Sequence, residues 1–140
     1  MEKPINYIAG LFFAFTTLSA FASDESPDCD NAMTTLDINQ CALIELDTAE
    51  ANMRRYLDAA LRRHEADATL VAAIQQSQAR WQDYREAHCD AVYTQWREGT
   101  ICGVMSLGCQ KALTRERTHT LWENFLVTME GESQLPEPAR

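Results

Sequence analysis

The sequence has few residues that interrupt helices and few basic residues. It contains five glycines and four prolines among 140 residues, and it shows almost none of the strict polar-apolar alternation that predicts a strand. Twelve lysines and arginines stand against 21 aspartates and glutamates, which gives a formal net charge of -9. This excess of acid argues against nucleic acid and anionic membranes as partners, and it favours a cationic one.

Common catalytic and cofactor-binding motifs are also missing. The chain has no Gly-x-Ser-x-Gly, no His-Glu-x-x-His, no phosphate-binding glycine loop and no Cys-x-x-Cys. The histidines are isolated from any nucleophile pattern, and the nearest group of cysteines and histidines matches no familiar zinc spacing. We therefore expect a protein that is not an enzyme and that binds no cofactor or metal.

The N-terminus has the pattern of a secretory signal peptide. Lys3 precedes an apolar run from Ile8 to Phe15, and the small-residue site Ala20-Phe21-Ala22 follows. The run is shorter than the roughly 20 apolar residues that span a bilayer. We expect cleavage after Ala22, which would leave one periplasmic domain without a stable membrane anchor.

Apolar residues recur at helical intervals in three later segments. Together with the position of Thr34, which can cap a helix, these intervals predict helices at about 36–64, 68–97 and 109–129. Glycines predict a connection at 98–107. Three amphipathic helices imply an all-α fold, a small antiparallel bundle. The expected organisation is a signal peptide (1–22), an N-terminal arm (23–34), a helical domain (35–130) and a flexible tail (131–140).

Each predicted helix has an apolar stripe that we expect to be buried. The first stripe is Leu36, Leu43, Leu46, Met53, Leu57 and Ala60 or Leu61; the second is Leu70, Ile74, Ser77 or Gln78, Trp81, Tyr84, His88, Val92 and Trp96; the third is Cys109, Leu113, Arg117, Leu121, Phe125 and Met129. Aromatic residues at helical spacing favour packing over a ligand pocket, which is the alternative for Trp81, Tyr84, Trp96 and Trp122.

All five cysteines follow the predicted signal peptide, where an export compartment would oxidise them. A bridge between Cys89 and Cys109 would join the second helix to the third and close a loop of about 20 residues, worth about 3 kcal/mol. Cys29 and Cys41 can pair only if the arm folds back, because one continuous helix would hold them about 18 Å apart. Cys102 is the odd thiol.

Three fates are open to Cys102. It can remain a free thiol, displace Cys109 from its partner Cys89, or form an intermolecular bridge that would make a homodimer. The placement of Cys102 between glycines, at residues 99 and 103, predicts that it lies in a loop.

Two segments around cysteines carry a resemblance to a known family. They are Trp81-x-x-Tyr84-Arg85-Glu86-x-x-Cys89 and Cys109-x-x-x-Leu113-Thr114-x-x-Arg117-x-x-x-Leu121. In this order they resemble the LprI-type lysozyme inhibitor family, a group of small exported helical domains. The stretch from Cys29 to Ala32 and Cys41 resemble the start of that domain, so the resemblance covers about residues 29–126. Cys102 is additional to the usual four cysteines.

Arg85 and Arg117 lie on or beside the apolar stripes of two predicted helices. Their guanidinium groups are therefore expected between the helices, paired with carboxylates such as Glu45, Asp47, Glu50 or Glu86. In this interpretation the residues named in the two segments, of which Trp81 is the first and Leu121 the last, hold the helices together. We call them the scaffold motif. The alternative is that an arginine contacts a target enzyme directly.

These features predict an exported, non-catalytic binding protein. The resemblance implies inhibition of a lysozyme, and the acidic composition suits a cationic one. In that hypothesis a projecting loop, such as residues 98–108, covers the glycan cleft of the enzyme. The alternative is a structural or interaction module of the cell envelope with an unknown partner.

Overall fold

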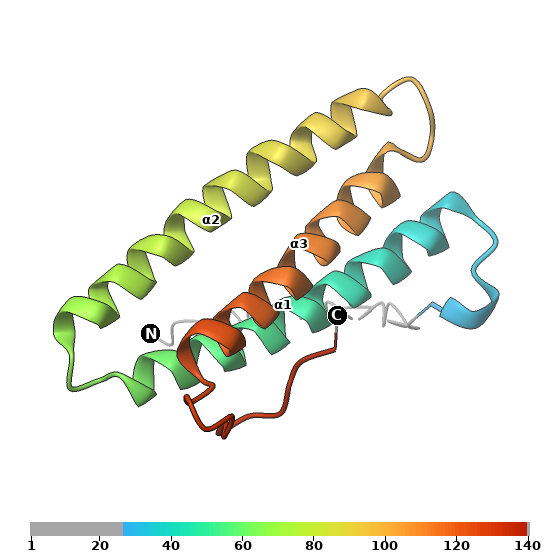
Figure 1. Cartoon of the computed structure of the whole chain (residues 1–140). Helices are drawn as coiled ribbons and strands as arrows, with labels where there is room; N and C mark the ends of the chain where they lie inside the picture. Colours follow the sequence, from blue (N-terminus) through green and yellow to red (C-terminus); the bar gives the residue numbers. More distant parts are fainter. Residues whose placement is uncertain (1–26, 140) are drawn as a thin grey trace, which may run out of the picture.

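The computed structural model describes residues 27–139 and consists of three long antiparallel helices joined by short turns (Figure 1). The elements are η1 (Cys29–Asn31), α1 (Thr35–Arg63), α2 (Ala68–Gln95) and α3 (Cys102–Phe125). Within residues 27–139 there is no strand, only an isolated bridge between Val127 and Ser133. The expected all-α bundle is confirmed. The predicted signal peptide and the first part of the arm lie outside the described residues.

Side-chain caps fix where α1 and α2 begin. The hydroxyl oxygen of Thr34 accepts a 3.1 Å hydrogen bond from the backbone N–H of Asp37, and the carboxylate of Asp67 accepts one of 3.0 Å from that of Leu70. Both side chains satisfy N–H groups that have no partner within the first turn. Because only residues 64–67 separate the helices, α2 must turn back antiparallel to α1.

Helix α3 begins at Cys102, well before the predicted start near Cys109. Gly103 and Gly108 were expected to belong to a connection, and both lie inside the helix. A Cβ atom at Gly103 would meet Oδ1 of Asn39 on α1, the end of a side chain that would then have to turn away. The helix forms despite the low helix propensity of glycine. The connection is residues 96–101, so residues 98–101 of the predicted loop are confirmed and residues 102–107 are wrong.

Helix α3 is the central helix and packs against both α1 and α2. Its buried side chains are mostly small or polar, and they are Ser106, Thr114, Arg117, Thr118, His119 and Leu121. The Thr114 hydroxyl donates to the carbonyl of Gln110 at 2.7 Å, and that of Thr118 donates to the carbonyl of Thr114 at 2.8 Å. These local hydrogen bonds satisfy the polar groups of a crowded interior.

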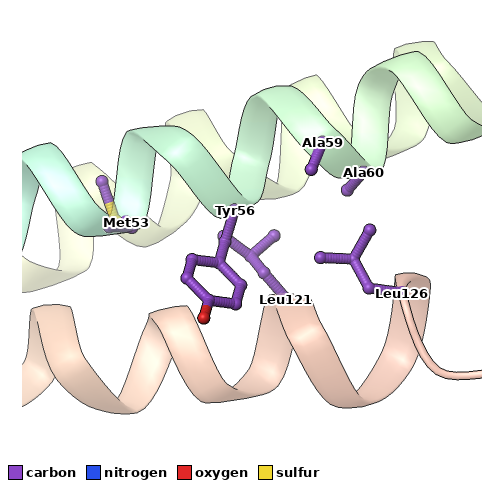
Figure 2. Packing of buried hydrophobic residues seen from close by; sticks show 6 residues of the cluster. All are labelled: Met53, Tyr56, Ala59, Ala60, Leu121 and Leu126. Carbon is purple, nitrogen blue, oxygen red and sulfur yellow. The ribbon is translucent and has the colours of Figure 1, made fainter. Parts of the chain in front are cut away.

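The hydrophobic core occupies one end of the bundle, where α1 ends, α2 begins and α3 ends. Figure 2 shows α1 residues facing Leu121 of α3 and Leu126 just beyond it. Tyr56 is 1% exposed, and Ala60, Leu121 and Leu126 are 0% exposed. We call this the core end. Burial of these apolar side chains is the main force that joins α1 to α3 there.

Two disulfides lie toward the opposite end, which we call the disulfide end and define as residues 27–45 and 89–109. Cys29 pairs with Cys41 across a Cα–Cα distance of 5.6 Å, so the arm does fold back onto α1. Cys89 pairs with Cys109 at 5.7 Å and joins α2 to α3. The structure is therefore braced by disulfides as the sequence predicted.

The C-terminal residues pack onto the core end, although the sequence suggested a flexible tail. The hydroxyl of Tyr56 donates a 2.7 Å hydrogen bond to the carbonyl of Pro136, and Nε1 of Trp122 donates one of 3.0 Å to the carbonyl of Leu135. Pro138 is buried. Aromatic rings with polar tips need acceptors when they pack inside a protein, and the backbone of the tail supplies them.

The apolar stripes are only partly buried. In α1, Leu36 is 66% exposed and Leu43 is also exposed, whereas Leu46 and Met53 are buried. In α2, the expected stripe residues Tyr84, His88 and Trp96 are exposed, and the buried residues are Ile74, Gln78 and Cys89. Because α2 packs mainly against α3, only a narrow face of it is buried. The prediction that Tyr84, His88 and Trp96 are buried is therefore wrong.

Candidate protein-binding surface

Arg85, in the middle of α2, connects all three helices. Its Nη1 donates a 2.7 Å hydrogen bond to Oε1 of Glu50 on α1 and one of 2.8 Å to the hydroxyl of Thr114 on α3. The guanidinium carbon also lies 5.1 Å from the centre of the Trp81 ring, within the range of a cation–π interaction. Of the four carboxylates proposed as its partner, Glu50 is the one that it contacts.

Arg117, on α3, is 9% exposed and has uncharged partners among the described residues. Its Nε donates to Oε1 of Gln78 at 3.0 Å, and its Nη2 donates to the hydroxyl of Ser77 at 3.1 Å. Burial lowers the pKa of the Arg117 guanidinium from its usual value, but arginine starts so high that the group stays charged at neutral pH. The prediction that Arg117 pairs with a carboxylate is therefore wrong.

The other residues of the predicted scaffold motif lie along the boundary between α2 and α3 with different exposures. Leu121 is buried in the core and Leu113 is half-buried, whereas Glu86 is exposed. Tyr84 is 53% exposed, and its ring stacks on that of His88 at 5.5 Å. A groove of about 210 Å³ follows this boundary and is lined by Trp81, Tyr84, Leu113, Glu116, Arg117 and Thr120.

Cys102 is the first residue of α3 and forms no disulfide. It is half-buried and interacts with the hydroxyl of Tyr93 on α2. The hydrogen bond with Cys102, and the electrostatic interaction with its sulfur, raise the pKa of Tyr93 above its usual value. A homodimer through Cys102 remains a prediction.

Exposed apolar side chains gather at the disulfide end. Eight of the ten large hydrophobic side chains that are exposed among residues 27–139 lie there. They are Met33, Leu36, Ile38, Leu43, Ile44, Tyr93, Trp96 and Ile101. Single exposed apolar residues are common on protein surfaces, but a concentration of them indicates an interaction site. Periodicity could not reveal this, because it placed several of these residues in stripes that we expected to be buried.

The same end is acidic. Within residues 27–45 and 89–109 there are six acidic side chains and a single basic one, Arg97. Glu45 on α1 pairs with Lys111 on α3. This hydrogen bond and the positive charge of Lys111 lower the pKa of Glu45. The disulfide end therefore combines apolar side chains with a negative potential.

None of the helices in residues 27–139 is long and apolar enough to cross a membrane. That part of the chain also holds no group of three or more histidine, cysteine, aspartate or glutamate residues placed to bind a metal ion.

Comparison with known proteins identifies the family. The model of the lysozyme inhibitor LprI family matches residues 28–121. The chain belongs to the LprI family. An uncharacterized protein of Rhizobium meliloti (strain 1021) is 29% identical over 118 residues, which cover 76% of this chain and 85% of that protein. No solved structure matches the chain. The LprI match includes both disulfides and the contacts of Arg85 and Arg117, and it ends before the C-terminal tail.

Proposed function

We propose that this LprI-family protein is an exported inhibitor of a cationic lysozyme, and that it acts by binding over the glycan cleft. The observation that carries the proposal is the family match over residues 28–121, which spans nearly the whole helical bundle. The family is one of inhibitors, so the proposed activity requires a stable binding surface and no catalytic group.

The charge of the chain supports the choice of a cationic target. A formal net charge of -9 attracts a basic enzyme over several ångströms and raises the rate of association, and salt screens this attraction. Inhibition should therefore require more protein as ionic strength increases, mainly because the complex forms more slowly.

The way in which the protein covers the cleft differs from the sequence-based hypothesis. That hypothesis used a projecting loop at residues 98–108, but residues 102–108 belong to α3. Only the short turn at 96–101 lies between the helices. Occlusion would thus come from the helical bundle and this short turn, which need little ordering when they bind.

Export is part of the proposal. Residues 1–22 would act as the signal peptide, and the mature protein would begin at Ser23 in the periplasm. The disulfides Cys29–Cys41 and Cys89–Cys109 suit an oxidising compartment. The intact mass of the protein recovered from the periplasm tests this: a chain that starts at Ser23 is expected, and a chain that retains residues 1–22 would contradict export by cleavage.

The inhibition assay uses the exported protein with its disulfides formed. It is mixed in stoichiometric excess with lysozymes of the c, g and i types at low salt, and the lysis of a cell-wall suspension is followed by turbidity. We expect at least one cationic lysozyme to be inhibited, with weaker inhibition at high salt. Full activity of every lysozyme would overturn the proposal, and a different partner captured from periplasm by crosslinking would favour an envelope interaction module.

A further inference from the structure

The two ends of the bundle are stabilised in different ways. At the core end, apolar side chains are buried between α1, α3 and the tail. At the disulfide end, two covalent bridges hold the helices, while eight large apolar side chains stay exposed. A disulfide stabilises a fold without burying apolar surface. The bridges therefore allow these side chains to remain available for a partner.

The turn between α2 and α3 is held by a disulfide and by hydrogen bonds. We call residues 93–102 the tip. Directly behind it, Cys89 and Cys109 join the two helices, and the hydroxyl of Ser106 donates a 3.2 Å hydrogen bond to the carbonyl of Cys89. Within the turn, the N–H of Gly99 donates to the carbonyl of Trp96 at 3.0 Å. The tip is thus organised before any partner binds, which reduces the entropy lost on binding.

Three large side chains of the tip are exposed. Tyr93 is 48% exposed, and Trp96 and Ile101 are each 42% exposed. Tyrosine and tryptophan are enriched among the residues that contribute most to protein–protein affinity, because they bury a large rigid surface and keep a polar group for hydrogen bonding. The tip therefore has the side chains of a protein-binding site.

Charge identifies the kind of partner. The disulfide end as a whole carries six acidic side chains and a single basic one, Arg97. Within the tip, Glu98 pairs with Arg97 at 3.3 Å, and Asp90 is exposed just before the tip. Two copies of this acidic end would repel one another, whereas a basic surface would be attracted to it. The occupant that fits an aromatic tip on an acidic end of the bundle is a cationic protein.

We propose that the tip is the part of the protein that inserts into the glycan cleft of a cationic lysozyme, with Trp96 and Ile101 as the apolar anchors. Two carboxylates, that of Glu98 in the tip and that of Asp90 just before it, would be the electrostatic partners. This assignment rests on the proposed inhibitory function. A glycan cleft presents apolar and hydrogen-bonding groups to sugar rings, and a flat indole ring can occupy the same space.

Met129, which follows α3 at the core end, provides a control. It is 100% exposed and apolar, and it lies outside the disulfide end. The test compares the wild type with a tip variant, Trp96→Ser with Ile101→Ser, and with a control variant, Met129→Ser. Each variant loses exposed apolar surface, so circular dichroism and urea unfolding should show that both remain folded.

Inhibition constants against a c-type or another inhibited lysozyme then decide the assignment. We expect the tip variant to inhibit about 30-fold less strongly, as for the loss of dominant contact residues, and the control variant to match the wild type. Glu98→Gln should slow association at low salt, whereas Asp58→Asn, which removes one exposed charge at the core end, should change it far less.

Three outcomes would overturn the assignment and are distinguishable. If the wild type inhibits and the tip variant inhibits equally well, the tip is not the contact, although the inhibitory function stands. If sedimentation shows a dimer that the tip variant disrupts without a change in inhibition, the tip binds a second copy of the chain. If the wild type inhibits no lysozyme, the proposed function fails together with this assignment.

Discussion

Arg85 on α2 donates a hydrogen bond of 2.7 Å to Glu50 on α1, across the face of the helix α3 that separates them. Both side chains are largely shielded from water, with 17% and 24% of their surfaces exposed. Because α3 contacts each outer helix while the outer helices scarcely contact one another, this ion pair is a direct connection between them. It holds α1 and α2 at a fixed separation.

Replacing Arg85 by alanine should destabilise the fold by about 2 kcal/mol, because the change removes its charge-assisted hydrogen bonds to Glu50 and Thr114. Glu50 would keep only the longer, 3.6 Å ion pair with Arg54. Urea unfolding measures the loss. A double-mutant cycle with Glu50→Gln should show a coupling energy of about 1 kcal/mol. Arg80→Ala removes an exposed arginine from the same helix and should leave the midpoint nearly unchanged; equal effects at the two positions would contradict a connecting role for Arg85.

The parts of the fold that the sequence predicted well depend on local chemistry. The cap at Thr34 and the length of α1 follow from residues near in sequence. The start of α3 was missed because glycine usually favours a turn, whereas Gly103 lies inside α3, where that helix approaches Asn39. This contact is with a helix more than 60 residues away, which no local pattern reveals.

The candidate site was harder to predict than the helices. Periodicity identifies an apolar stripe but not whether a partner covers its full length, so Leu36 and Trp96 were expected inside and are exposed. The partner of Arg117 was missed for a related reason. A carboxylate was expected, but the residue of α2 that faces Arg117 is the buried Gln78. Its amide is uncharged, so, unlike a carboxylate, it adds no second buried charge that would have to be desolvated.

Removal of the Cys89–Cys109 bridge should lower the free energy of unfolding by about 3 kcal/mol, because the unfolded chain regains the entropy of a loop of about 20 residues. The double variant Cys89→Ser with Cys109→Ser tests this in urea under non-reducing conditions. Cys102→Ser is the control, since that thiol closes no loop. A loss as large in the control as in the double variant would show that chain entropy is not the cause.

Deletion of residues 132–140 should destabilise the core end. Tyr56 and Trp122 would lose the backbone acceptors Pro136 and Leu135, and each lost hydrogen bond costs about 1 kcal/mol. Tyr56→Phe provides an internal check, because it should reduce the stability of the full chain by about 1 kcal/mol and have little effect after the deletion. Equal effects of Tyr56→Phe in both backgrounds would indicate that the contact does not form in solution.

The pair between Glu45 and Lys111 should make stability depend on pH in the acidic range. The folded state lowers the pKa of Glu45 below 4.5, so the stabilisation is present above about pH 4.5 and is lost as the pH falls through the lower folded pKa. An NMR titration of the Glu45 carboxyl should show this low pKa, and Lys111→Gln should raise it toward 4.5. An unchanged pKa in that variant would exclude the ion pair as the cause.

The tip at the disulfide end is the segment that we propose binds a lysozyme. Hydrogen–deuterium exchange of the disulfide-bonded protein, alone and with an excess of an inhibited lysozyme, tests it most directly, because exchange reports which backbone segments a partner covers. Binding through the tip predicts new protection in residues 93–102 and no new protection in residues 53–60 of the core end. Protection confined to any other surface, with residues 93–102 unchanged, would contradict it.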